Sequence, residues 1–260
     1  MRLRSRAAAA LLLCTLAAPL TVGCDARDSS GPASPAESAP WVDPAAQARV
    51  RAVVEQGTGA KMTILDVYSP AEYAAAMQRQ QETVFGDDVP LETARDASQA
   101  CLAANREVTA LEAGSGARAL AGAGSAGGLG AASPEGYVNL TVTDFPDEAS
   151  ARESWAGHGR VRAACAGQDG WLGMLDAREA SWEGAQAGQS GQAVVFTRRI
   201  PGPDGNEVRM QAAHVLDGRR QYVLNRRTDG PDAASEATGR TDGTADVALL
   251  REVADALASG

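Results

Sequence analysis

Two cysteines, Cys101 and Cys165, are the side chains best able to carry covalent chemistry in the folded part of the chain. Both fall on apolar faces of predicted helices, and a lone pair of cysteines outside the cytoplasm usually forms a disulfide. We therefore expect a bond that joins the two helices, worth roughly 4 kcal/mol through loop-closure entropy. Two buried free thiols, or a metal pair completed by a histidine, are the alternatives.

The two histidines, His158 and His214, lie in no recognised zinc or catalytic motif. His158 stands between two glycines at a predicted helix bend, whereas His214 shares a strand face with apolar residues and is expected in the core. Three serines lie near glycines, but none is in a Gly-x-Ser-x-Gly motif: Ser115, Ser125 and Ser190. We expect no catalytic residue and no metal ligand.

Six arginines form doublets near the ends of strands predicted between residues 192 and 227. Guanidinium groups pair well with phosphate and carboxylate, so the doublets are candidates for an anion-binding site. Lipid headgroups, wall polymers or a carboxylate would be the ligands. The alternative is a solvated set of strand ends balanced by acidic helices. The doublets are Arg198 with Arg199, Arg219 with Arg220, and Arg226 with Arg227.

The first 24 residues have the pattern of an export signal. Three arginines, the last of them Arg6, precede an uncharged stretch that ends in Leu20–Cys24 (LTVGC), a sequence similar to the lipobox of bacterial lipoproteins. Cys24 would then carry a thioether-linked diacylglycerol, and two acyl chains are enough for stable anchoring. Cleavage at a nearby Ala-x-Ala-like site, which would give an ordinary secreted protein, is the alternative.

The composition and order of segments suggest one tethered domain. Without a signal peptide at 1–23, which holds three arginines and no acid, the chain has 21 basic and 33 acidic residues, a net charge of −12. Such an acidic chain is a poor nucleic-acid binder. Residues 24–42 are expected to form a flexible tether and 43–260 a single domain. We place the protein at the outer face of the cytoplasmic membrane, with the bilayer as a partner and no cofactor beyond the lipid on Cys24.

The helical and strand patterns predict an α+β fold. Residues 113–132, rich in glycine and alanine, show no periodicity and are expected to form a mobile loop inside the domain. The second half is expected to form an antiparallel meander, with the helices packed on one face. Helices are predicted at 44–56, 70–84 and 90–111, from Asp147 through Cys165, and around Leu249–Leu257; strands are predicted at 62–67, 137–143, 171–182, 192–200, 207–216 and 220–226.

Three segments together resemble a known class of domain. They are the helix carrying Cys101, the sequence Gly136–Pro146 (GYVNLTVTDFP), and an Ala-rich helix that ends at Ala164–Gly167 (ACAG). Their order is similar to that of the sensor-type extracellular domains of actinobacteria, which occur as lipoproteins and as the outer part of receptor Ser/Thr kinases of mycobacteria. The resemblance spans about residues 60–258 and implies a non-catalytic binding domain with a central groove. The kinase-linked members carry two disulfides, whereas this chain can form only one.

These observations favour a membrane-anchored binding or sensing module for an unidentified envelope ligand. A cell-envelope hydrolase with an unrecognised active site and a purely structural envelope protein are the alternatives. A cleft with paired acid and base residues would favour the hydrolase, and an apolar or arginine-lined groove would favour binding.

Overall fold

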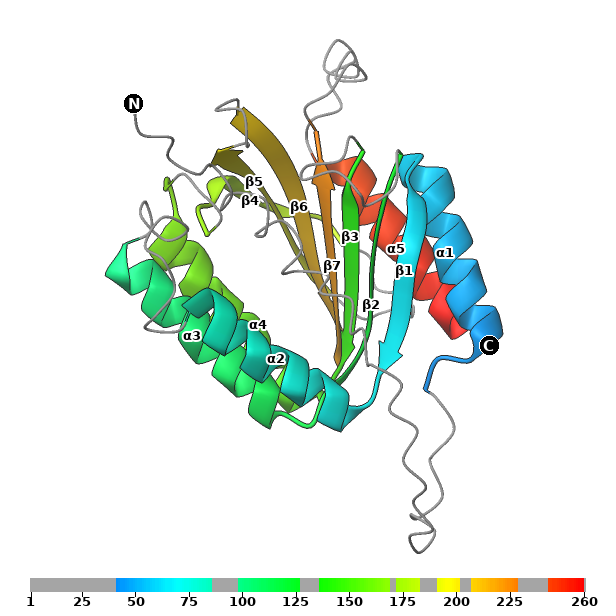
Figure 1. Ribbon diagram of the computed structural model, residues 1–260, viewed down its shortest axis with the longest axis horizontal. Coiled ribbons are helices and arrows are strands. Elements are labelled where there is room, and N and C mark those ends of the chain that lie inside the picture. The colour runs from blue at the N-terminus through cyan, green and yellow to red at the C-terminus, as the bar shows by residue number, and fades with distance from the viewer. Residues whose placement is uncertain are drawn as a thin grey trace, which may run out of the picture.

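A single antiparallel sheet of seven strands organises the computed structural model of the chain (Figure 1). The structure describes residues 41–85, 98–126, 136–168, 172–182, 191–201, 207–228 and 243–259. The strands lie in the order β1-β2-β3-β7-β6-β5-β4, and each neighbouring pair is antiparallel. The α+β class and the antiparallel meander expected from the sequence are therefore confirmed.

The strands are β1 (Lys61–Tyr68), β2 (Arg118–Ser125), β3 (Val138–Asp144), β4 (Leu175–Ala180), β5 (Gln192–Pro201), β6 (Glu207–Asp217) and β7 (Arg220–Arg227). The helices are α1 (Pro44–Thr58), α2 (Pro70–Phe85), α3 (Gln99–Gly114), α4 (Glu148–Cys165) and α5 (Thr244–Ala258).

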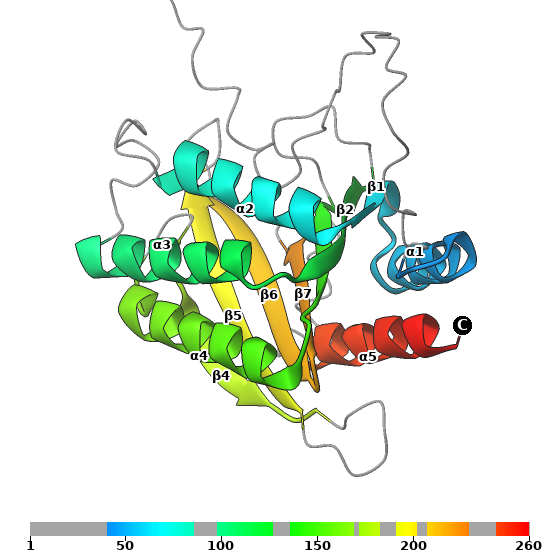
Figure 2. The ribbon, with the colours of Figure 1, turned by 90° about the horizontal axis from the view of Figure 1, so that it is seen from below.

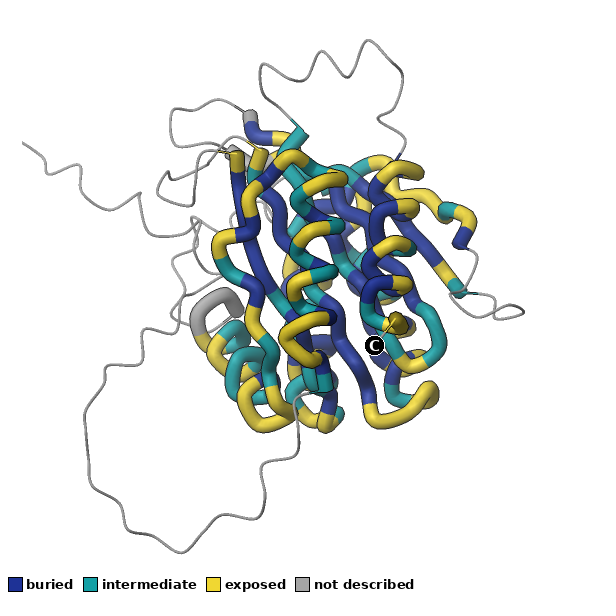
Figure 3. The backbone as a smooth tube through the Cα atoms, turned by 90° about the vertical axis from the view of Figure 1, so that its right-hand side faces the viewer, coloured by how far each residue is buried: buried dark blue, intermediate teal, exposed yellow. Residues whose placement is uncertain are grey.

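Helices cover both faces of the sheet, which corrects the expectation that they pack on one face. Helices α1 and α5 lie against one face, and α2, α3 and α4 lie against the other (Figure 2). The physical reason is visible in β5. Val195 packs in the apolar layer under α1 and α5, and Phe196 packs in the layer under α2, α3 and α4. Neighbouring strand residues point to opposite faces, so a strand that is apolar at both needs a cover on both. Buried strands run behind the half-exposed helices in Figure 3.

Strand β2 occupies much of the segment that was expected to be a mobile loop, residues 113–132. It pairs with β1 on one side and β3 on the other. Side chains on Gly122 or Gly124 would collide with β1, because a Cβ atom at either position would stand 2.3 Å from a β1 carbonyl oxygen. The small residues therefore allow a close approach of two strands. Residues 127–135 lie outside the described residues.

Helix starts follow local capping chemistry. The side chains of Asp43, Ser98 and Asp147 accept hydrogen bonds from the first turns of α1, α3 and α4. Ser69 and Glu72 form a capping box at α2, where a helix is predicted to begin at residue 70. The third helix was expected to begin at Pro90, but α3 begins at Gln99 because Ser98 has an extended backbone. Residues 86–97 are outside the described part of the chain.

The folded domain begins slightly earlier than expected. Val42 is buried and Trp41 packs against the layer beneath α1 and α5, so these two residues belong to the domain and not to a tether at 24–42. The predicted signal peptide, the rest of the tether and Cys24 lie outside the described residues. None of the described helices is long and apolar enough to cross a membrane.

Candidate functional site

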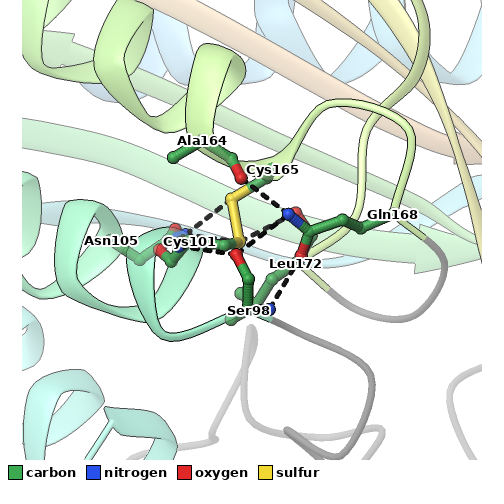
Figure 4. Close-up of a disulfide and its surroundings, with 7 residues drawn as sticks. All are labelled: Ser98, Cys101, Asn105, Ala164, Cys165, Gln168 and Leu172. Carbon is green, nitrogen blue, oxygen red and sulfur yellow. Dashed lines mark hydrogen bonds between the residues drawn. A yellow bond between two sulfur atoms is a disulfide. The ribbon is translucent and has the colours of Figure 1, made fainter.

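Cys101 and Cys165 form the expected disulfide, which joins the start of α3 to the end of α4 (Figure 4). Both cysteines are fully buried. The amide of Gln168 donates to the Ser98 hydroxyl and to the Ala164 carbonyl, so it bridges the same two helix ends. The bond links the two helices that carry Glu112 and His158.

A buried carboxylate, Glu112 of α3, gathers polar groups from two other helices, α2 and α4. Its oxygens accept hydrogen bonds from the hydroxyls of Ser154 at 2.7 Å and Tyr73 at 3.0 Å, and one oxygen lies 2.9 Å from Nε2 of His158. Burial disfavours the charged form of Glu112, but the nearby His158 and these hydrogen bonds outweigh it and lower its pKa. A charged carboxylate is thus held inside the helical layer.

The two histidines lie together. His158 is a half-buried residue of a continuous α4, not of an exposed bend, and its ring stands 5.7 Å from that of His214. His214 is buried, as expected, and lies edge-on to Phe196. Ser154 and His158 both contact the same oxygen of Glu112, and no hydrogen bond between the two side chains is present among the described residues. No group of three or more metal-ligating side chains occurs among the described residues.

A second buried carboxylate, Asp144, explains the Arg219–Arg220 doublet. The Asp144 side chain is 1% exposed, and it accepts hydrogen bonds from Arg118 at 2.8 Å and from Arg219 and Arg220 at 3.1 Å each. The guanidinium groups of Arg118 and Arg220 also lie over the Trp41 ring, at 5.0 and 5.8 Å from its centroid. We call this set the Asp144 clamp. These arginines hold the domain together, so they are not the solvated pair of the alternative reading.

The remaining doublets lie at the opposite end of the sheet. Arg226 is six residues from Arg220 along β7, which corresponds to about 20 Å. It pairs with buried Asp246 of α5 at 2.7 Å. Arg198 and Arg199 are consecutive on β5 and point to opposite faces. The six arginines therefore do not form one site.

Arginines meet instead across strands, in a pocket of about 370 Å³ formed by β4, β5 and β6. Arg199 is paired directly with Arg209, and Thr197 with Gln211, so these four residues share one face. Two like charges opposite each other repel, and an anion lying between them would relieve that repulsion. The pocket is lined by Leu175, Asp176, Arg178, Val195, Phe196, Thr197, Arg199, Arg209 and Gln211.

The floor and rim of the pocket differ in polarity. Val195 and Gln211 are buried, whereas the arginines are exposed; the side chain of Phe196 packs on the other face of the sheet, in the layer under α2, α3 and α4. Gln211, whose amide faces the pocket, is 5% exposed. An apolar floor with one amide and a cationic rim suits a ligand with an acidic group and an apolar part.

The sequence pointed to only one of the pocket arginines, Arg199. Arg178 and Arg209 are single residues rather than doublets, and only the strand register brings them together. Glu112 was also missed. Its spacing of four residues from Val108, on the face that bears Cys101, would have placed it on the buried side of α3.

Comparison of the sequence with protein-family models and with curated proteins found no match.

Replacing Glu112 by Gln tests the buried carboxylate. We expect a loss of about 2 kcal/mol of stability at pH 7, because the hydrogen-bond donors lose a charged acceptor. The folded-state pKa of Glu112 is lowered, so its contribution is present above the unfolded pKa and is lost as the pH falls through the folded one. The difference between wild type and variant, measured by urea unfolding, should shrink below about pH 4. Glu107→Gln, at an exposed acid of the same helix, is the control. A difference that stays constant down to pH 3 would contradict this.

The Asp144 clamp predicts a cost for removing its arginines. Arg118→Gln combined with Arg220→Gln should lower the free energy of unfolding by about 3 kcal/mol, because the buried carboxylate loses two of its three cationic partners. Arg152→Gln removes an exposed ion pair with Glu148 and should cost less than about 1 kcal/mol. Equal, small effects in chemical denaturation of both variants would show that the clamp contributes nothing.

Proposed function

We propose that this protein is an extracytoplasmic, lipid-anchored binding module that takes an anionic ligand in the arginine-lined pocket of β4, β5 and β6. The observation that carries the proposal is the convergence of Arg178, Arg199 and Arg209 on one hollow. Among the described residues that line the pocket, Asp176 is the acid that accompanies them. Guanidinium groups bind phosphate and carboxylate through paired hydrogen bonds, and the volume lies within the range of small-molecule sites.

The disulfide supports a location outside the cytoplasm. Structural disulfides form and persist in oxidising compartments and are rare in reducing ones. The Cys101–Cys165 bond is buried and joins two helices of the core, so it belongs to the structural kind. It agrees with the export pattern at residues 1–24 and with the resemblance to actinobacterial sensor-type lipoprotein domains.

The positions of the two ends of the sheet support a role in binding away from the anchor. Trp41, where the tether from Cys24 would arrive, lies on the Asp144 clamp. The pocket lies about 20 Å away along the strands, at the end that holds Arg226. The pocket is therefore separate from the point where the tether joins the domain, so a ligand can bind there without contacting the attachment point.

Binding of polyanions provides the test of the pocket. We expect saturable binding of pyrophosphate or citrate, the phosphate and carboxylate probes, to the domain 41–260 by calorimetry, with weaker binding at 0.5 M than at 0.05 M NaCl because salt screens exposed charges. Replacing Arg199 and Arg209 together by Gln should weaken it at least tenfold, while Arg152→Gln should leave it unchanged. If neither probe binds, or if both variants bind like wild type, the pocket is not an anion site.

The anchor is tested separately, in cells. Cys24→Ala removes the only thiol that the lipobox-like sequence offers for acylation, so we expect the protein to appear in the medium or to stay unprocessed at its full mass. Fractionation and immunoblotting distinguish these outcomes. A variant that remains in the membrane fraction at the mature mass would show that the protein is held by something other than a lipid on Cys24.

A further inference from the structure

Two half-buried guanidinium groups on the other face of the sheet each have one shielded nitrogen without a hydrogen-bond partner. Nε of Arg198 on β5 and Nη1 of Arg162 on α4 are both shielded from solvent and make no hydrogen bond with the described residues. Arg162 lies over the Trp155 ring, 4.7 Å from its centroid, and Arg198 lies 5.2 Å from that of Phe196. Aromatic rings replace only part of the hydration that a buried cation loses.

Both arginines act on the same histidine. The pKa of His214 is well below its ordinary value because the ring is buried and because His158, Arg198 and Arg162 add positive potential. Burial also lowers the pKa of Arg198 to about 10, which leaves it charged at neutral pH. The space between α4 and the strands β5 and β6 therefore has an excess of positive charge.

The buried carboxylate beside His158 is already engaged by other groups. Glu112 is held by His158 and by the hydroxyls of Tyr73 and Ser154, and neither arginine contacts it. The exposed cation of the same helix, Arg160, does have an acidic partner, Glu107. Native proteins rarely leave buried charges unpaired, because removing a partner from such a charge costs several kcal/mol.

The geometry points to an internal anion site between α4 and β5, where a small oxyanion such as phosphate is bound by Arg162 and Arg198 beside the His158–His214 pair. Its ligand groups lie on α4, β5 and β6, and the site is independent of the pocket of the proposed function. Arg198 and Arg199 are consecutive on β5, so they point to opposite faces of the sheet. An anion there would accept hydrogen bonds from the unsatisfied nitrogens of Arg162 and Arg198 and link α4 to the sheet.

Inorganic phosphate is the probe, and the two histidines of the chain are the reporters. We expect the imidazole NMR signals of His158 and His214 to shift with phosphate in a saturable way at constant ionic strength and pH 7. The pKa of His214 should rise in saturating phosphate, because the anion offsets the positive potential of the arginines. The same titration with chloride should produce no saturation. Absence of a saturable shift in the wild-type protein would overturn the site.

Variants separate this site from the pocket. Arg162→Gln and Arg198→Gln should each raise the Kd for phosphate at least tenfold in this assay, whereas Arg160→Gln should leave it unchanged. The Arg199→Gln and Arg209→Gln double variant should retain the histidine response even if it loses pyrophosphate binding. If that double variant abolishes the histidine response while Arg162→Gln keeps it, phosphate acts from the pocket and the internal site is wrong. Circular dichroism confirms that each variant is folded.

Discussion

The buried carboxylate of Glu112 is the interaction on which the helical layer depends. It lies on α3, yet its partners come from α2 and α4, and Tyr73 in turn lies 3.5 Å from Thr143 of β3. A charge in a low-dielectric layer is tolerated only when hydrogen bonds and an opposite charge surround it. These demands fix which face of each helix turns inward. The disulfide fixes the far ends of α3 and α4, so the layer is held at two points.

That rigid layer determines where binding chemistry can occur. Helices α2, α3 and α4 cover one face of the sheet, and α1 and α5 cover part of the other. At the β4 side, the described residues leave the pocket open beside the first turn of α5. A Cβ atom on Gly243, which precedes that helix, would stand 2.7 Å from Val195 and 2.9 Å from Gln211. The absence of a side chain there lets α5 approach the residues that form the pocket floor.

The sequence predicted what local chemistry encodes. The predicted helix starts at residues 44, 70 and 147 agree with the caps at Asp43, Ser69 and Asp147, and the pairing of Cys101 with Cys165 followed from the number of cysteines and the expected compartment. Strand β2 was missed because alanine and glycine have no strand periodicity of their own. Its stability comes from pairing with β1 and β3 on both sides, and such long-range contacts leave no local pattern in the sequence.

The arginines show most clearly why the candidate site needed a structure. A doublet in the sequence suggests two charges acting together, but along a strand neighbouring side chains point apart. Arg198 therefore belongs to the α4 face and Arg199 to the pocket face. Charges that do act together lie opposite each other on adjacent strands, as Arg199 and Arg209 do, or converge on one buried acid, as in the Asp144 clamp. In a domain with such an acidic overall charge, a cross-strand pair of arginines such as Arg199 and Arg209 concentrates positive charge at the place where an external anion gains most.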